Sequence, residues 1–275
     1  MRKLTVKNFS VIKDAELEFR RITVLIGPQA EGKSLLCKLG YFLGAEMIGF
    51  AVDSLLDRNS WDEYLKTVVR EFNSRFATNG WLKNSSFASF ESQQYKAELR
   101  GVGAPLSPGI EFTFSDAFHQ LYSILNKKVS LQAPYKNMGV GELRQELWIQ
   151  FSLLINKRRT QTNVYIPSGR SFFTDTAKSV SVLQNLGLDW ITRRFADQVF
   201  WDTRWKIGLL STGQGVARDI EREMDRIARG HVEIVESKPL FLSPDGRSLP
   251  LSLLSSGTQE LLPMFSTMNY LAFHQ

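Results

Sequence analysis

Residues 21–34 read Arg-Ile-Thr-Val-Leu-Ile-Gly-Pro-Gln-Ala-Glu-Gly-Lys-Ser, which places the pattern G-x-x-x-x-G-K-S between an apolar run and a helical one. The run Val24-Leu25-Ile26 is typical of a buried parallel strand, and residues 34–39 are expected to open a helix. A strand, a glycine-rich turn and a helix in this order form a phosphate-binding loop. The motif therefore predicts an α/β fold with a sheet around the helix that follows the loop.

The residue types in the loop suit a nucleoside triphosphate bound with Mg²⁺. Backbone N–H groups from Gln29 to Ser34 are expected to converge on the β-phosphate, helped by the positive end of the helix dipole. Lys33 would reach the β- and γ-phosphates, and the Ser34 hydroxyl would bind Mg²⁺. The Glu31 carboxylate would repel phosphate unless its side chain points away. The predicted site comprises Gly27, Pro28, Gln29, Ala30, Glu31, Gly32, Lys33, Ser34 and Leu35.

Composition predicts a folded protein of a reducing compartment. The chain has 275 residues, of which 43% are hydrophobic, and its single cysteine, Cys37, excludes an intrachain disulfide. The most hydrophobic window, residues 34–56, contains Lys38, Glu46 and Asp53, so it is interpreted as a buried helix rather than a membrane span. With no segment that reads as a secretory signal, the predicted location is the cytoplasm. Three scattered histidines make a zinc site improbable.

The charge balance favours an anionic partner only weakly. The formal net charge is +6 and the pI is about 9.4. Basic clusters occur at residues 157–159 and 193–194, where solvated helix faces are favoured over a dedicated nucleic-acid groove. A nucleic-acid partner therefore stays open at this point.

The pattern along the chain divides it into three regions. Residues 1–50 are expected to hold the first part of a nucleotide-binding lobe, with strands over residues 3–9, 15–19 and 22–26 and then the first helix. Residues 51–230 are expected to be a mainly helical insertion, although residues 79–103 fit no element and residues 112–114 look strand-like. Residues 231–275 are expected to form a hairpin and a final helix.

Shorter elements are expected within the last two regions. A helix is expected from residue 141 to residue 155, and a strand over residues 163–167 would display Arg170 at its edge. A second helix is expected over residues 216–227, ended by Gly230. Strands are expected at residues 232–235 and 240–242, followed by a hairpin turn at residues 243–247.

A second motif lies near the end of the sequence. Residues 253–262 read Leu-Leu-Ser-Ser-Gly-Thr-Gln-Glu-Leu-Leu, which in isolation is an ordinary helix start with a serine or threonine cap. Behind a phosphate loop, this stretch resembles the signature motif of ABC-type ATPases, which docks across a dimer onto the γ-phosphate bound to the other subunit. Serine hydroxyls and a helix N-terminus both offer donors to an anion.

Four stretches together carry a family resemblance: residues 3–14, the phosphate loop, residues 165–170 and residues 254–262. The pattern resembles the ATPase heads of the RecF/SMC branch and, more closely, the bacterial ATPases of the overcoming-lysogenisation-defect (OLD) and Septu anti-phage groups. The resemblance implies a P-loop NTPase fold, an ABC-ATPase-head-like sheet around the phosphate-loop helix with a large helical insertion.

The resemblance also implies ligands and partners. Asn8 and Phe9 would lie near the base of ATP, while Ser255, Ser256 and Gly257 would act in trans, with Lys33 and Ser256 as the catalytic groups. Arg170 would contact phosphate or transmit the nucleotide state, or be an ordinary salt-bridging arginine. A homodimer closed around two Mg-ATP molecules is implied, coupled to an effector protein and plausibly engaged in anti-phage defence or DNA maintenance.

One departure from the family pattern bears on catalysis. An ABC-type head continues after its signature helix into an apolar strand ending in Asp-Glu, which supports Mg²⁺ and orients the attacking water. No Asp or Glu follows Glu260 here. Three explanations fit the missing acidic strand. The sequence is a fragment, another chain supplies the missing lobe, or the protein binds nucleotide without hydrolysing it efficiently. Little or no turnover is therefore expected from this chain alone.

Two further classes of function remain open. The first is another P-loop enzyme, either a GTPase or a small-molecule kinase. Against a GTPase, the sequence has no Asn-Lys-x-Asp motif to recognise the guanine base, because the runs beginning at Asn126 and Asn156 both lack the Asp. The other is a non-catalytic interaction module in which the nucleotide is structural and the helical insertion binds a protein or nucleic acid.

Overall fold

A computed structural model describes residues 2–76, 78, 81–104, 107–131, 135, 138–155, 164–167, 189–195, 216–235 and 238–273. The chain forms two compact units, Met1–Asn163 and Val164–Gln275. Both mix α-helices and β-strands, so the α/β class is confirmed at this level. The two units are described separately below.

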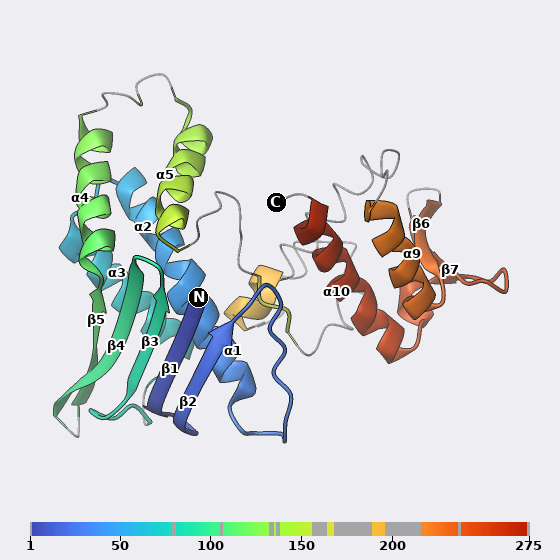
Figure 1. Ribbon diagram of the computed structural model, residues 1–275, viewed down its shortest axis with the longest axis horizontal. Helices are drawn as coiled ribbons and strands as arrows, with labels where there is room; N and C mark the ends of the chain where they lie inside the picture. The colour runs from blue at the N-terminus through green and yellow to red at the C-terminus, as the bar shows by residue number, and fades with distance from the viewer. Residues whose placement is uncertain are drawn as a thin grey trace. The chain divides into compact units, whose positions relative to one another are not determined.

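The first unit is built on a five-stranded antiparallel sheet (Figure 1). Its spatial order is β2-β1-β3-β4-β5, and every neighbouring pair is antiparallel. The strands are β1 (Arg2–Phe9), β2 (Ile12–Phe19), β3 (Phe87–Ser92), β4 (Tyr95–Ala104) and β5 (Ser107–Phe114). The predicted strands over residues 3–9, 15–19 and 112–114 are confirmed.

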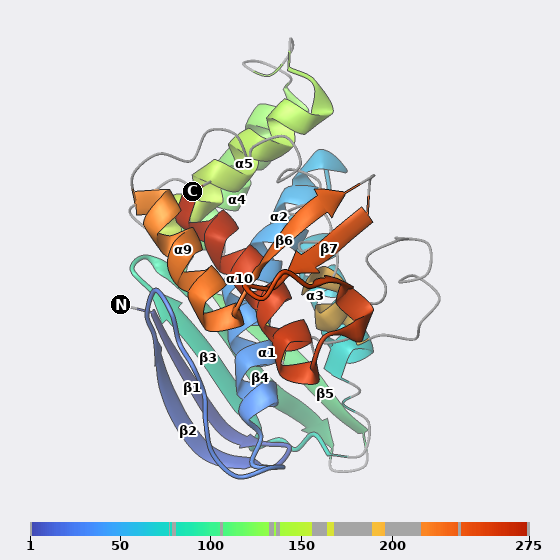
Figure 2. The same cartoon turned by 90° about the vertical axis from the view of Figure 1, so that its right-hand side faces the viewer.

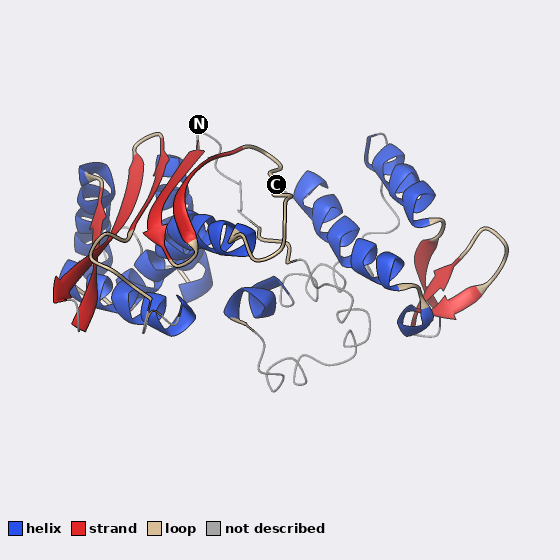
Figure 3. Cartoon of the chain, turned by 90° about the horizontal axis from the view of Figure 1, so that it is seen from below, coloured by secondary structure: helices blue, strands red, loops and turns tan. Residues whose placement is uncertain are grey.

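The helices of this unit cover one face of the sheet (Figure 3). One continuous helical stretch follows the phosphate loop as α1 (Lys33–Tyr41), the π-helical turn η1 (Phe42–Glu46) and α2 (Met47–Leu56). The others are α3 (Trp61–Phe76), α4 (Asp116–Ser130) and α5 (Val140–Ile155). The helices expected to begin after the loop and near residue 141 are therefore present.

Side-chain alternation places β1 in the core. Leu4 and Val6 are fully buried, and simple alternation would put Asn8 beside them. Asn8 instead adopts a left-handed conformation, with φ of 48°, and it is exposed. The chain is thereby turned so that Phe9 becomes the next buried residue, with its ring centroid 4.7 Å from that of Trp81.

Two glycines let the phosphate-loop helix approach the sheet closely. A Cβ at Gly40 would lie 2.4 Å from the ring of Phe19, and a Cβ at Gly44 would lie 2.8 Å from the ring of Phe90. Any side chain at these positions would push the helix off the two rings, because cores are close-packed. The position of α1 relative to the sheet is therefore fixed by these contacts.

The opposite face of the sheet is polar and paired. Lys96 Nζ lies 2.7 Å from Glu98 and 3.1 Å from Glu91, and Lys3 Nζ lies 2.8 Å from Glu16. The hydrogen bond to Glu98 is the main cause that raises the pKa of Lys96. Charges of opposite sign therefore alternate on this face and pair with one another.

Three sequence expectations are corrected. Residues 22–26 form no strand, and Ile22, Val24 and Ile26 are exposed rather than buried. The reason is that the described sheet is antiparallel and offers this segment no parallel neighbour. Residues 164–167 are also not a strand. Finally, residues 87–104 of the region expected to be mainly helical form β3 and β4.

The described residues of the second unit form a small antiparallel sheet, two longer helices and a short helical segment over residues 190–195. Its other elements are α9 (Val216–Ala228), β6 (His231–Val235), β7 (Lys238–Leu242), β8 (Ser248–Pro250), the 3₁₀ turn η2 (Leu251–Leu253) and α10 (Ser256–Phe273). The sheet order is β6-β7-β8, and residues 243–247 connect β7 to β8 as the predicted hairpin turn. The view in Figure 2 shows α9 and α10 against each other.

Gly230 closes α9 much as predicted. Its N–H donates to the Asp225 carbonyl at 2.9 Å, and the preceding Arg229 has φ of 56°. A Cβ at Gly230 would lie 2.4 Å from the Leu242 carbonyl oxygen, so the glycine is also required by the close approach of β7.

The stretch Lys33–Leu56 is long and apolar enough to cross a membrane by length and composition alone. In the structure, 67% of its apolar window is buried inside the protein. This burial agrees with the interpretation as a core helix packed on the sheet.

Candidate phosphate-binding site

The predicted phosphate loop joins the end of β2 to the start of α1. Ala30 and Gly32 have φ of 67° and 84°, and Gly27 has φ of 151°. Left-handed residues alternating with right-handed ones turn successive N–H groups toward a common point, as in anion-binding nests. The loop from Gly27 to Glu31 is exposed to solvent, so a phosphate group has free access to it.

Donors are available where the loop enters the helix. The first hydrogen bond of α1 runs from the Leu36 N–H to the Gly32 carbonyl, at 2.9 Å. The N–H groups of Lys33, Ser34 and Leu35 therefore have no acceptor within the helix. These are donors of the kind that bind phosphate at a helix N-terminus.

The two side chains that the motif predicts for phosphate and metal, Lys33 and Ser34, lie at this helix start. The Lys33 ammonium donates to the Pro28 carbonyl, so it folds back over the loop. A phosphate oxygen would attract it more strongly, because charge-assisted hydrogen bonds exceed those to neutral carbonyls. The Ser34 side chain is exposed, and Glu31 is exposed as well. The serine is thus accessible to a metal ion bound with the nucleotide.

The turn between β1 and β2 lies against the phosphate loop. A Cβ at Gly32 would lie 2.8 Å from Ile12 Cγ1 and 3.1 Å from Val11 Cγ2. The turn holds two left-handed residues, Asn8 and Ser10, with φ of 48° and 54°. Such conformations are costly outside glycine and cluster at functional sites. Val11 is 62% exposed beside the loop, so an apolar surface borders the predicted phosphate site.

The two residues expected near the base have different surroundings. Asn8 is exposed, and its carbonyl accepts a hydrogen bond of 2.7 Å from Ser86 Oγ. The Phe9 ring is fully buried among other aromatic rings, including those of Phe72 and Trp81. Its side chain therefore serves the core, and only its main chain is left for a ligand.

Sequence reasoning missed the contribution of Val11 and Ile12 to this site. The sequence carries little sign of this contact, because it joins two segments about twenty residues apart. Neither the motif nor the hydrophobic periodicity indicates that two such segments meet. Cys37, one helical turn beyond Ser34, is partly buried, and burial raises the pKa of its thiol. A raised pKa lowers the share of the reactive thiolate, which supports the interpretation of Cys37 as a packing residue.

Among the described residues, no group of three or more His, Cys, Asp and Glu side chains could hold a metal ion. The fit for Mg²⁺ thus rests on the Ser34 hydroxyl and on phosphate oxygens of a bound nucleotide. Mg²⁺ keeps several waters and is commonly held by one or two carboxylates together with phosphates.

The signature-like residues lie in the second unit. Ser255 precedes α10 and caps it: its Oγ accepts from the Thr258 N–H at 3.4 Å and lies 2.9 Å from Thr258 Oγ1. Its carbonyl accepts from the Gln259 N–H at 2.9 Å. Ser256 and Gly257 begin the helix and are exposed. A Cβ at Gly257 would meet nothing within 4 Å, so packing within the described chain does not require this glycine. Arg170 lies outside the described residues.

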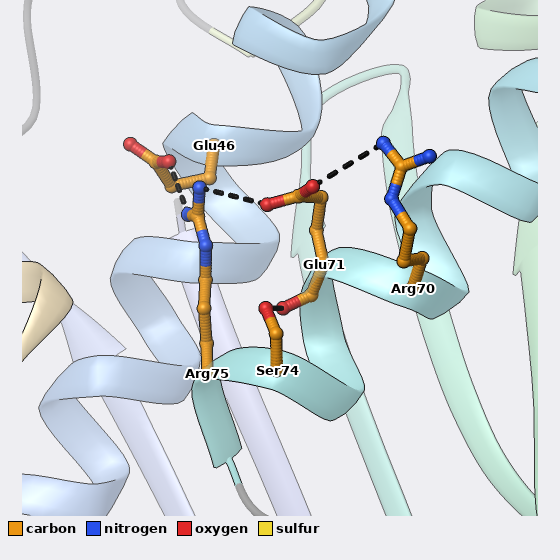
Figure 4. A network of polar contacts seen from close by, with 5 residues as sticks. All are labelled: Glu46, Arg70, Glu71, Ser74 and Arg75. Carbon is orange, nitrogen blue, oxygen red and sulfur yellow. Dashed lines mark hydrogen bonds and ion pairs between the residues drawn. The ribbon is translucent and has the colours of Figure 1, made fainter.

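A buried ion pair fixes the far end of the phosphate-loop helix (Figure 4). Glu46, in the π-helical turn, is 3% exposed and pairs with Arg75 of α3 at 2.5 Å. Arg75 also lies 3.4 Å from Glu71, and its guanidinium carbon is 4.8 Å from the ring centroid of Phe50. The network ties the helix that carries Lys33 to α3.

Comparison with known proteins adds no relative: no protein-family model matches the sequence, and a search of the curated proteins finds no match.

Proposed function

We propose that this chain binds Mg-ATP at residues 27–35 and works as an ABC-type ATPase head of the RecF/SMC branch. The observation that carries the proposal is the loop geometry: free N–H groups at the start of α1, with Lys33 and Ser34 beside them and left-handed residues at Ala30 and Gly32. An exposed nest at a helix N-terminus suits a phosphate chain.

In this proposal the loop holds the phosphates and the metal. Lys33 neutralises charge on the β- and γ-phosphates, and Ser34 contributes its hydroxyl to Mg²⁺. Bound Mg²⁺ supplies charge neutralisation between the two phosphate groups. The described residues provide no carboxylate cluster near the loop, so efficient hydrolysis requires acidic groups from elsewhere.

Residues 22–26 supply a place for such groups. Ile26 is 89% exposed, Val24 is 75% exposed, and the backbone here joins no sheet. A β-strand placed beside this segment would cover the exposed side chains and pair the free backbone groups. We propose that the acidic residues of the active site come on such a strand.

Val11 is proposed as the apolar contact for the base of ATP. Val11→Asp is expected to weaken ATP binding about tenfold, because the charge would replace an apolar surface beside the base, and to leave inorganic tripolyphosphate binding nearly unchanged. The measurement is displacement of a fluorescent ATP analogue by each ligand. Val102→Asp, at another partly exposed valine, is the control. An equal loss for both ligands would mean that Val11 acts on the loop rather than on the base.

Closure around nucleotide is tested by light scattering. Mg-ATP is expected to double the molecular mass of the chain, and Ser256→Arg is expected to prevent doubling, since a bulky cation would fill the space that the γ-phosphate of the partner subunit needs. A mass that never depends on nucleotide or on Ser256 would contradict the sandwich. Coupling to an effector protein or to nucleic acid belongs to the same proposal.

A non-catalytic module is the second candidate function, and the lack of a carboxylate cluster among the described residues favours it. It predicts tight Mg-ATP binding with negligible turnover in any assembly. ATPase activity that Lys33→Ala abolishes would exclude it.

A further inference from the structure

One exposed helix face lies at the opposite end of the first unit from the phosphate loop (Figure 1). It consists of Ile124, Lys127, Lys128 and Leu131 of α4 and its C-terminal cap, and is called the α4 face below. These positions recur at three, four and seven residues, so they share one side of the helix. Phe118, Tyr122, Leu125 and Val129 occupy the other side and are buried.

Apolar side chains gather at this end of the helix pair. Leu131 is 74% exposed and Ile124 is 51% exposed. The start of α5 adds Met138 and Val140, of which Val140 is 71% exposed. The helices α4 and α5 are in contact, and the end of α4 and the start of α5 lie at the same end of the first unit (Figure 1). Single exposed apolar residues are ordinary, but a group of them at one end of a unit indicates an interaction site.

The charges of the α4 face are of one sign. Lys127 and Lys128 are exposed, and within the described part of the chain neither forms an ion pair. Both cations complement the C-terminal end of the α4 dipole, which explains why lysines occur at these positions. The dipole does not explain the exposed apolar residues on either side of them. A partner that covers Ile124 and Leu131 must also face two ammonium groups.

We propose that the α4 face binds an acidic amphipathic helix of another protein. Apolar anchors one heptad apart, with lysines between them, match a helix that presents an apolar stripe flanked by Glu or Asp. A second copy of this chain is disfavoured, because a two-fold contact through this face would bring lysines against lysines. Nucleic acid is disfavoured as well, since aliphatic side chains offer bases no stacking platform.

Peptide binding to the full chain tests the proposal. The probes are two fluorescent three-heptad peptides with Leu at the a and d positions, one with Glu and one with Lys at the e and g positions, measured by anisotropy. The Glu peptide is expected to bind at least tenfold more tightly than the Lys peptide. The double variant Lys127→Glu/Lys128→Glu is expected to reverse this preference, and Ile124→Ser/Leu131→Ser to weaken binding of the Glu peptide about tenfold.

Two variants away from the α4 face serve as controls for the peptide experiment. Lys66→Glu, on the exposed side of α3, and Val102→Ser, on β4, are expected to leave both affinities unchanged, and thermal unfolding checks that every variant is folded. Failure of the Glu peptide to bind, or a preference that survives the double charge reversal, would overturn the proposal. So would binding of the chain to phosphatidylserine vesicles in place of the peptide, which would make the α4 face a lipid-binding surface.

Discussion

Arg75→Met is expected to lower the free energy of unfolding by about 3–5 kcal/mol, the largest loss of stability foreseen for a single polar substitution here. Glu46 is 3% exposed and its carboxylate pairs with Arg75. The substitution removes the guanidinium that lies 2.5 Å from this buried carboxylate, and it also removes a cation–π contact with Phe50. Chemical denaturation followed by circular dichroism measures the loss.

The same network provides a matched control. Arg70 pairs with Glu71 at 3.3 Å but is 71% exposed, so Arg70→Met is expected to cost no more than about 1 kcal/mol. The double variant Glu46→Leu/Arg75→Met is expected to recover most of the stability, because both charges of the buried pair are then replaced by apolar side chains. If Arg75→Met cost no more than Arg70→Met, the ion pair would not be what holds η1 against α3.

Gly32→Ala is expected to weaken Mg-ATP binding at least tenfold and to destabilise the first unit by about 1–3 kcal/mol. The residue has φ of 84°, which is strained for alanine. Its new Cβ would also lie 2.8 Å from Ile12 Cγ1 and 3.1 Å from Val11 Cγ2, so the β1–β2 turn or the loop must move. Calorimetric titration and denaturation report the two effects.

Gly246 supplies the control for backbone strain. It has the same φ of 84° in the β7–β8 turn, but a Cβ there would meet nothing within 4 Å. Gly246→Ala therefore carries the cost of the left-handed conformation without the clash, and it is expected to leave nucleotide binding unchanged. Equal losses of stability in the two variants would show that the contact with Val11 and Ile12 contributes nothing.

The sequence predicted helices and strands correctly where interactions between residues close in sequence determine them. Alternation in residues 3–9 and 15–19 predicted β1 and β2, and the G-x-x-x-x-G-K-S pattern predicted a helix from residue 34, one residue after α1 begins at Lys33. Ser255 caps α10 as an isolated Ser-Ser-Gly-Thr stretch would. In each case the deciding interactions lie within a few residues of one another.

The wrong predictions of secondary structure concern segments whose conformation depends on residues distant in sequence. Val24 and Ile26 have the β-branched, apolar character of a buried strand, yet the described sheet gives them no neighbour, so they are exposed. Residues 87–104 carry serines, glutamines and glycines that obscured their alternation, and they become strands because β3 pairs with β1 across some eighty residues. No local pattern reports such pairing.

For the candidate site, the sequence predicted which residues stand at the start of the helix but not what surrounds them. Lys33 and Ser34 are the first two residues of α1, whereas the contact of Gly32 with Val11 and Ile12 depends on how the β1–β2 turn folds over the loop. That turn depends on left-handed φ angles at Asn8 and Ser10, residues whose identities alone do not demand them.

The central claim is that residues 27–35 bind Mg-ATP through Lys33, and calorimetric titration of Mg-ATP into the chain and into Lys33→Ala tests it most directly. We expect one nucleotide bound per chain, and a loss of affinity of at least a hundredfold in Lys33→Ala, because the variant loses the ammonium that pairs with the phosphates. Lys66→Ala, which removes an exposed charge from α3, should bind as the unaltered chain does. Equal affinities for the unaltered chain and Lys33→Ala, or no binding by the folded, unaltered chain, would contradict the account.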